Sequence, residues 1–89
     1  MSLEIEHQRE RQRFLAVVEG HDCTIDYRLA NGVMTITHTW VPAEVGGRGI
    51  AGELTRFALA TARAEGWKVE AECSYALRYL ERHPDERVA

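Results

Sequence analysis

Four glycines gather within seven residues near the middle of the chain, in the segment Gly46-Gly47-Arg48-Gly49-Ile50-Ala51-Gly52. The segment lies between the expected end of a strand and the expected start of a helix that has no Ser, Thr, Asp or Asn at its N-cap position. The first N–H groups of that helix therefore lack a side-chain partner. Backbone N–H groups that converge from a glycine-rich turn, assisted by the helix dipole, form a site suited to phosphate. The spacing predicts phosphate binding here; the alternative is a helix entry whose amides bind water.

Two common phosphate-binding motifs do not account for this segment. It contains no G-x-x-x-x-G-K-[ST], which argues against a P-loop NTPase. Gly47, Gly49 and Gly52 do match G-x-G-x-x-G. A dinucleotide-binding fold, however, places its glycine turn after its first strand and needs further βαβ units. Here the turn follows the third expected strand, so a Rossmann domain is not expected.

Cys73 is a second candidate for chemistry. It lies where an expected strand passes into the last expected helix, so the helix dipole should lower the pKa of its thiol. A thiolate at this position could act as a nucleophile. Cys73 also continues the alternation of Trp67, Val69 and Ala71, and this pattern fits an ordinary buried cysteine equally well.

His38 is a candidate general base. It is expected on the face of its strand that also carries Ile36 and Trp40. An imidazole at such a position is either a hydrogen-bonded core residue or a group that takes up a proton during catalysis. Cys23, which the expected pairing sets opposite Trp40, is interpreted as structural.

These residues must be positioned by strands and helices, and the clearest signal for such elements is the dipeptide Asn31-Gly32. It accepts positive φ at both central positions and predicts a two-residue β-hairpin. With these residues as the loop, apolar positions of one strand meet the apolar-leaning face of the next. The expected pairs are Ala30–Val33, Leu29–Met34, Tyr27–Ile36, Ile25–His38 and Cys23–Trp40.

The remaining elements follow from periodicity and from glycine and proline signals. A strand is expected over Phe14–Val18, and a helix from about Ile50 to Glu65 that Gly66 ends. Its apolar stripe is expected to hold Ile50, Leu54, Phe57 and Thr61, with Ala58 beside it. A strand from Trp67 to Cys73 and a helix from Tyr75 to about Arg82, capped by Ser74, follow. The order β-β-β-α-β-α predicts an α+β fold, with helices packed on a mixed, mostly antiparallel sheet.

Length and composition exclude several classes of protein. The 89 residues, 45% hydrophobic and 28% charged, predict a single domain over residues 1–89. A net charge of −3 argues against a nucleic-acid binder. No apolar run approaches the ~20 residues that span a bilayer, and the first residues lack the features of a signal peptide. We expect a cytoplasmic protein with reduced thiols and no metal site, and a monomer or weak homodimer.

Four motifs in order resemble one known family. His38-Thr39-Trp40-Val41-Pro42 is similar to its HTxVP, the segment from Gly46 to Ala51 to its RGxGIA, and Cys73 to a cysteine after the last strand. His83-Pro84-Asp85 is similar to its HPE. The chain from about Phe14 onward thus resembles the minimal members, of about 90 residues, of the GNAT superfamily of N-acetyltransferases. The opening Gln or Arg of the superfamily's loop is replaced by Gly46.

The resemblance implies a cofactor and a set of residues that bind it. The cofactor is acetyl-CoA or coenzyme A. The resemblance assigns its pyrophosphate to the amides of Gly46, Gly47, Arg48, Gly49, Ile50 and Ala51, and its pantetheine arm to the backbone of Thr39, Trp40 and Val41. Arg48 would partly compensate for the missing side chain at Gly46, unless it is simply a solvated arginine.

The resemblance also implies acetyl transfer to an amine that the sequence does not identify. Cys73 would either accept the acetyl group or line the thiol end of the cleft, and His38 would assist. Tyr79 could protonate the departing thiolate or simply pack, and Glu44 and Glu72 could attract a cationic amine. A non-catalytic sensor or scaffold that binds CoA or a nucleotide is the alternative, because a short chain leaves few residues for an amine pocket. A pure interaction domain is a third.

Overall fold

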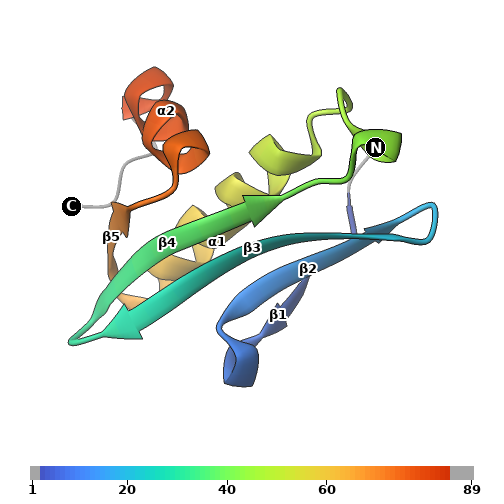
Figure 1. Ribbon diagram of the computed structural model, residues 1–89. Coiled ribbons are helices and arrows are strands. Elements are labelled where there is room, and N and C mark those ends of the chain that lie inside the picture. Colours follow the sequence, from blue (N-terminus) through green and yellow to red (C-terminus); the bar gives the residue numbers. More distant parts are fainter. Residues whose placement is uncertain (1–2, 85–89) are drawn as a thin grey trace.

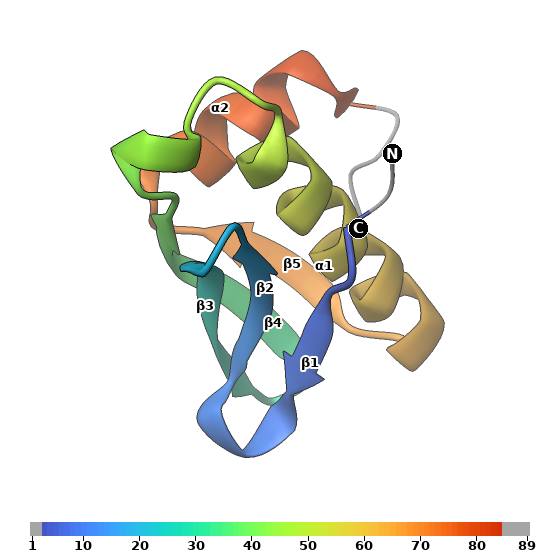
Figure 2. The ribbon, with the colours of Figure 1, turned by 90° about the vertical axis from the view of Figure 1, so that its right-hand side faces the viewer.

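A computed structural model describes residues 3–84 and shows a sheet with a helix across one face (Figure 1). The second helix packs beside the first, near the end of the sheet (Figure 2). The strands are β1 (Glu6–Gln8), β2 (Arg13–Val18), β3 (His21–Ala30), β4 (Val33–Trp40) and β5 (Lys68–Ala71). The helices are α1 (Ile50–Glu65) and α2 (Ser74–Arg82), and short 3-10 turns cover Arg9–Arg11 and Ala43–Val45.

The sheet is mixed, as expected from the order of the elements. Its strands lie in the order β1-β2-β3-β4-β5, with antiparallel neighbours except for the parallel pair β4 and β5 that α1 connects. The α+β class is therefore confirmed. The structure adds one strand to the four expected, because Glu6–Gln8 pairs with the start of β2 as β1.

The hairpin of β3 and β4 agrees with the predicted register only as far as Tyr27–Ile36. Beyond that pair a β-bulge leaves Thr37 with no residue of β3 directly opposite it. Asp26 therefore lies opposite His38, Ile25 opposite Thr39 and Thr24 opposite Trp40. The predicted pairs Ile25–His38 and Cys23–Trp40 are therefore wrong. One extra residue shifts the alternation of β4 and exchanges the faces of the side chains that follow it.

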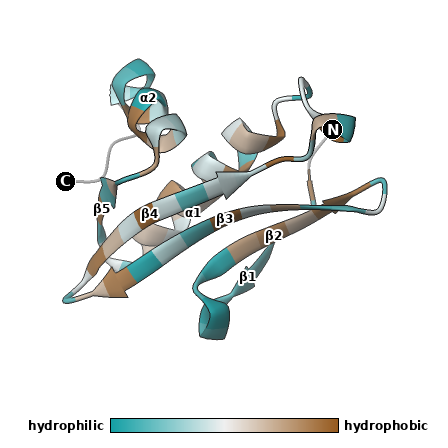
Figure 3. Ribbon diagram, viewed as in Figure 1, coloured by the Kyte–Doolittle hydropathy of each residue, from teal (hydrophilic) through white to brown (hydrophobic). Residues whose placement is uncertain are grey.

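The core is a single apolar cluster between the sheet and the helices. Apolar and polar residues alternate along much of β3 and β4 (Figure 3), as strands with one covered face require. Strand β2 is apolar from Phe14 to Val18, and there Phe14 and Ala16 are the buried residues. Helix α1 contributes Ile50, Leu54, Thr55, Ala58, Leu59 and Ala62. Phe57 remains 38% exposed, so the buried stripe is rotated from the predicted one. Gly66 ends α1 in the left-handed conformation, as expected.

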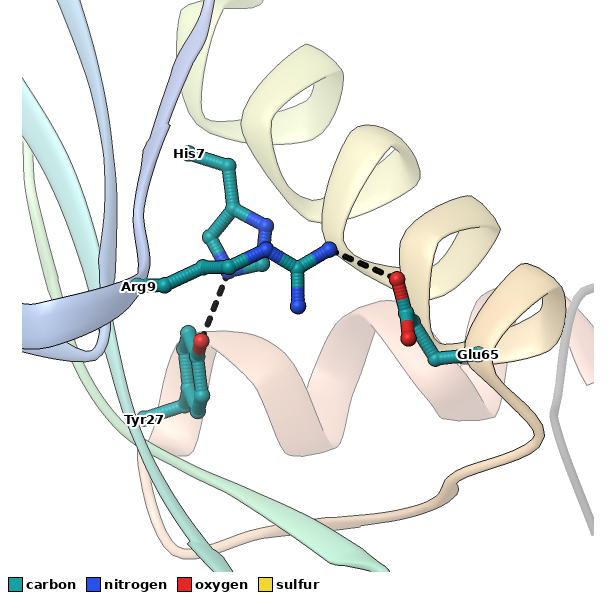
Figure 4. A network of polar contacts seen from close by, with 4 residues as sticks. All are labelled: His7, Arg9, Tyr27 and Glu65. Carbon is teal, nitrogen blue, oxygen red and sulfur yellow. Dashed lines mark hydrogen bonds and ion pairs between the residues drawn. The ribbon is translucent and has the colours of Figure 1, made fainter.

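A polar network joins β1 to β3 and to the end of α1 (Figure 4). The His7 ring stacks on Phe14 with a centroid distance of 4.3 Å, and its Nε2 lies 2.7 Å from the Tyr27 hydroxyl. Arg9 forms an ion pair of 2.6 Å with Glu65. Burial lowers the pKa of His7 below its ordinary value of 6.5, Arg9 lowers it further, and Glu65 opposes both. The burial of the ring thus favours a neutral imidazole at His7.

This network predicts a pH-dependent stability. Because the folded-state pKa of His7 is below that of the unfolded chain, the unfolded state binds more protons at acidic pH. The contribution of His7 is fully present above pH 6.5, the pKa of the unfolded chain, and is lost as the pH falls below this value through the lower pKa of the folded state. Urea unfolding at pH 7.5 and pH 5.5 should show a smaller difference in midpoint for His7→Phe than for the wild type. Equal differences in the two proteins would contradict the assignment to His7.

Candidate functional site

The glycine segment forms a loop that enters α1 without a capping side chain. Gly47 and Gly49 have φ angles of 78° and 77°, which only glycine adopts without strain. Gly49 is the N-cap residue of α1 and makes no side-chain capping hydrogen bond, and its carbonyl accepts the N–H of Glu53 at 3.1 Å. The predicted absence of a side-chain cap is confirmed. The first amides of α1 are therefore available to an anion.

A cleft of about 360 Å³ opens between the start of α1 and α2. Its lining carries three guanidinium groups and one carboxylate, so the cleft is locally positive although the chain as a whole has a net charge of −3. Such a lining favours anionic groups. The lining residues are Gly49, Gly52, Glu53 and Arg56 at the α1 side, and Tyr75, Arg78, Tyr79, Arg82 and His83 at the α2 side.

Gly52 leaves room for this cleft. A Cβ atom at this position would lie 3.6 Å from the Tyr75 hydroxyl and 4.0 Å from Cε2 of Tyr79. The backbone of Gly52 belongs to α1, and its φ lies outside the left-handed range. The glycine is therefore not required by the backbone. What it provides is free space between the two helices.

Aromatic rings follow one another along the α2 side of the cleft. Tyr75 and Tyr79 have a centroid distance of 6.4 Å, and Tyr79 and His83 one of 4.3 Å. Burial raises the pKa of Tyr75, the positive charge of Arg82 opposes this, and a negative charge on Cys73 adds to it. The Tyr75 hydroxyl thus lies within electrostatic reach of both Arg82 and the Cys73 thiol. Tyr79 is almost completely buried, which fits a packing role.

Cys73 is half-buried at the N-cap position of α2, and its Sγ lies 3.5 Å from the Thr39 hydroxyl oxygen. Burial is the largest single influence on its pKa and raises it. Hydrogen bonding from the Thr39 hydroxyl and from the N–H groups of Ala76, Tyr75 and Thr39 outweighs burial, so the pKa of Cys73 is lowered from 9.0. The neutral thiol makes no capping hydrogen bond with α2, so these amides stabilise mainly the thiolate.

The two cysteines should differ in reactivity. Cys23 is completely buried, and burial together with Asp22 raises the pKa of its thiol, whereas the pKa of Cys73 is lowered. Iodoacetamide at pH 7.5 should therefore modify Cys73 at least about 10-fold faster than Cys23, because the thiolate is the reactive species. Intact-mass analysis over time would measure both rates. Thr39→Val should slow the reaction of Cys73, and Cys23→Ala should leave it unchanged; preferential labelling of Cys23 would contradict the prediction.

Strands β4 and β5 separate immediately before Cys73. They pair from Val33–Lys68 as far as Ile36–Ala71, and the N–H groups of Glu72 and Cys73 both donate to the Ile36 carbonyl, at 2.8 and 3.2 Å. Beyond this point β4 continues to Trp40 alongside β3, while the chain after β5 turns into α2. Among residues 3–84 no strand pairs with this edge of β4. Backbone groups are therefore available beside Cys73.

The structure brings Cys73 together with Thr39 and not with His38. The bulge at Thr37 places Thr39 opposite the buried Ile25, on the covered face of the sheet. His38 is exposed and lies opposite Asp26 on the other face. The expectation that His38 shares a face with Ile36 is wrong for this reason.

The other residues predicted to bind the cofactor lie on β4 beyond the point where it separates from β5, or along the glycine loop and the start of α1. Trp40 is 54% exposed, Val41 packs partly buried against the core, and Ile50 is buried within it. Gly46 and Gly47 are exposed, and Ala51 is half-buried in the first turn of α1. Arg48 is exposed and forms an ion pair of 2.7 Å with Glu19. Asp85 of the HPE-like motif lies outside the described residues.

Sequence reasoning missed the arginines of the cleft. Arg78 and Arg82 lie four residues apart on α2, which places them on one helix face. Arg56 lies four residues after Gly52 on α1. These spacings are visible in the sequence, but they become informative only when the two helices are known to face one another.

The mixed sheet, the separation of β4 from β5, and the glycine loop at the start of α1 define the class of acyltransferase folds that the motifs suggested. A family model described as GCN5-related N-acetyltransferase matches residues 13–88. The chain belongs to this family, which confirms the resemblance.

Individual relatives agree with this assignment. The chain is 31% identical to Protein NATD1 of Gallus gallus, over 92% of this chain and 77% of that protein, and equally identical to Protein NATD1 of Mus musculus. A GCN5-like protein of Staphylococcus aureus, solved in solution, superposes with a TM-score of 0.75 at 30% identity, covering 96% of this chain and 84% of that one.

A ribosomal-protein-alanine N-acetyltransferase of Brucella melitensis biovar Abortus 2308 shares the fold, with a TM-score of 0.60 at 17% identity, covering 91% of this chain and 67% of that one.

Within residues 3–84, neither helix has the length and apolar character needed to cross a membrane.

Proposed function

We propose that this chain binds acetyl-CoA in the cleft between α1 and α2 and transfers the acetyl group to an amine. The observation that carries the proposal is a juxtaposition: the uncapped glycine loop borders a cleft lined by Arg56, Arg78 and Arg82, and Cys73 lies directly before the helix that forms the other side of that cleft. The cofactor would run from this cleft along the unpaired edge of β4 to Cys73. An anionic head, an extended arm and a thioester end would each meet matching groups along this path.

The glycine loop suits the diphosphate of the cofactor. The amides of residues 46–51, together with the dipole of α1, offer donors without a competing side-chain cap. Left-handed Gly47 and Gly49 carry no Cβ that would hold a phosphate away from these amides. Arg48 would join only by leaving Glu19.

The edge of β4 suits the pantetheine arm. This arm carries two amide groups, and Thr39, Trp40 and Val41 offer backbone groups on the side that β5 has left. A strand edge binds an extended amide chain as it would bind another strand. The arm would then end beside Cys73 and the Thr39 hydroxyl, which are 3.5 Å apart.

In this proposal the bound cofactor supplies an activated acetyl thioester. Cys73 would accept the acetyl group on the protein, because the surrounding donors lower the pKa of its thiol. The bond from Cys73 Sγ to the acetyl carbon would form as the bond from the CoA sulfur breaks, and the CoA sulfur would take up the proton that the thiol had lost. The amine would then displace Cys73 from the acetyl group and give up its proton to solvent.

A catalytic base must reach the proton that an amine loses before it attacks. His38 is exposed on the face of the sheet opposite Cys73, so this geometry does not support the assisting role that the resemblance implied for it. Glu72, predicted to attract a cationic amine, is exposed and forms an ion pair of 2.8 Å with Arg28.

Isothermal titration with acetyl-CoA tests binding, and we expect a dissociation constant in the micromolar range. No heat and no thermal shift at millimolar ligand would overturn the proposal. Intact-mass analysis after incubation tests the role of Cys73: a gain of one acetyl group that persists in Cys73→Ala would exclude it as the acceptor. CoA release with a panel of amines tests transfer, and tight binding without release would favour a sensor or scaffold.

A further inference from the structure

The cleft contains more positive charge than a diphosphate on the glycine loop requires. The loop and the first turn of α1 supply backbone donors, and Arg56 lies on the same helix. Arg78 and Arg82 belong to the opposite side, on α2. Since α2 is a separate element from the loop, its arginines suggest a second anionic group in the same cleft.

The two sides of the cleft differ in the charge of their side chains. Glu53, in the first turn of α1, is the carboxylate of the lining, and it disfavours a second phosphate on that side. Arg78 and Arg82 are exposed, and among residues 3–84 neither forms an ion pair. As residues i and i+4 they are neighbours on one helix face and can hold one phosphate between them.

The position of these arginines along α2 fixes their distance from the reacting end. Arg78 and Arg82 follow Cys73 by five and nine residues, which is roughly 7 and 14 Å along the helix axis at 1.5 Å per residue. They lie in the direction away from the thiol. The group they would hold is therefore at the nucleotide end of the cofactor.

We infer that Arg78 and Arg82 bind a phosphate monoester of the cofactor, the 3′-phosphate of CoA, and thereby select CoA over its form without this phosphate. This inference rests on the proposed function, since it presupposes that CoA occupies the cleft. It goes further in naming which chemical group determines the choice of cofactor and which side chains make that choice. A guanidinium group donates paired hydrogen bonds to phosphate, and such charge-assisted bonds are among the stronger ones in proteins.

Titration of the full chain with CoA and with dephospho-CoA tests the inference, because the two ligands differ only in the 3′-phosphate. We expect the wild type to bind CoA about 10- to 100-fold more tightly. In the double variant Arg78→Gln/Arg82→Gln this ratio should fall to about 3 or less. The affinity for dephospho-CoA should change by no more than about 3-fold.

A matched control removes the same charge elsewhere. Arg11 and Lys68 are exposed and do not line the cleft, so Arg11→Gln/Lys68→Gln should keep the wild-type ratio at equal ionic strength. A reduced ratio in this control would show that overall charge, not the cleft, discriminates, and would overturn the inference. The inference would also be overturned if Arg78→Gln/Arg82→Gln lost affinity for CoA and for dephospho-CoA equally. Equal affinities of the wild type for the two ligands would overturn it as well. Binding of neither ligand would overturn the proposed function as well.

Discussion

Replacing Gly52 with aspartate is expected to weaken acetyl-CoA binding at least about 100-fold, which corresponds to roughly 2.7 kcal/mol. A Cβ at Gly52 already lies in contact with the Tyr75 hydroxyl, at 3.6 Å, so a larger side chain occupies the cleft. The carboxylate also repels the phosphates that the loop is proposed to bind. Isothermal titration of the variant against the wild type measures the effect.

Stability provides the control for this variant. Gly52 has a helical backbone, and an acidic residue in the first turn of a helix is favourable. The urea midpoint should therefore be unchanged or slightly higher. Ala60→Asp introduces the same charge at an exposed position of α1 outside the cleft and should bind acetyl-CoA as the wild type does. Wild-type affinity in Gly52→Asp would show that the cofactor lies elsewhere.

Replacing Phe14 with alanine is expected to destabilise the fold by about 3–5 kcal/mol. Phe14 is completely buried and contacts three other rings: His7 at 4.3 Å, Tyr27 at 5.5 Å and Phe57 at 5.7 Å. Its removal leaves a cavity where β1, β3 and α1 meet. For a domain of this size such a loss is a large share of the total stability.

The same strand offers a matched control. Val17 lies on β2 and is 59% exposed, so Val17→Ala should cost less than about 1 kcal/mol. Urea unfolding of both variants under identical conditions gives the comparison. Similar losses in the two variants would mean that Phe14 is not the centre of the packing around β1.

Local signals were enough to predict most of the fold. Asn31-Gly32 determines the hairpin because few dipeptides accept positive φ twice, and Ala30–Val33 does pair as predicted. Gly66 ends α1 at the expected residue. The parallel pairing of β4 with β5 follows from the crossover helix alone. The hairpin and the end of α1 depend on residues close together in the chain, and the parallel pairing depends on the order of the elements.

The bulge at Thr37 could not be predicted from local sequence signals. Thr35, Thr37 and Thr39 alternate regularly with larger residues, and nothing in this pattern shows that one of them has no partner. The bulge depends on how β4 packs against β3 and the elements that follow. Its effect on the site is direct, because it places Thr39 rather than His38 next to Cys73.

The cleft was also only partly predictable. The glycine loop is one continuous segment and was found from its composition. The α2 side of the cleft depends on the packing of α2 against α1, through contacts such as that of Gly52 with Tyr75. The strand β1 was missed for a similar reason, since Glu6–Gln8 is too short and too polar to show a strand pattern.

The junction of the loop with the core has a mechanical consequence. Gly49 borders the cleft, and the next residue, Ile50, is only 4% exposed within the core. No linker separates the two, so the loop has no hinge of its own. A ligand held by these amides would be anchored directly beside the buried core. Its binding energy would then add to the stability of the folded state, and occupancy of the cleft would protect the chain against unfolding.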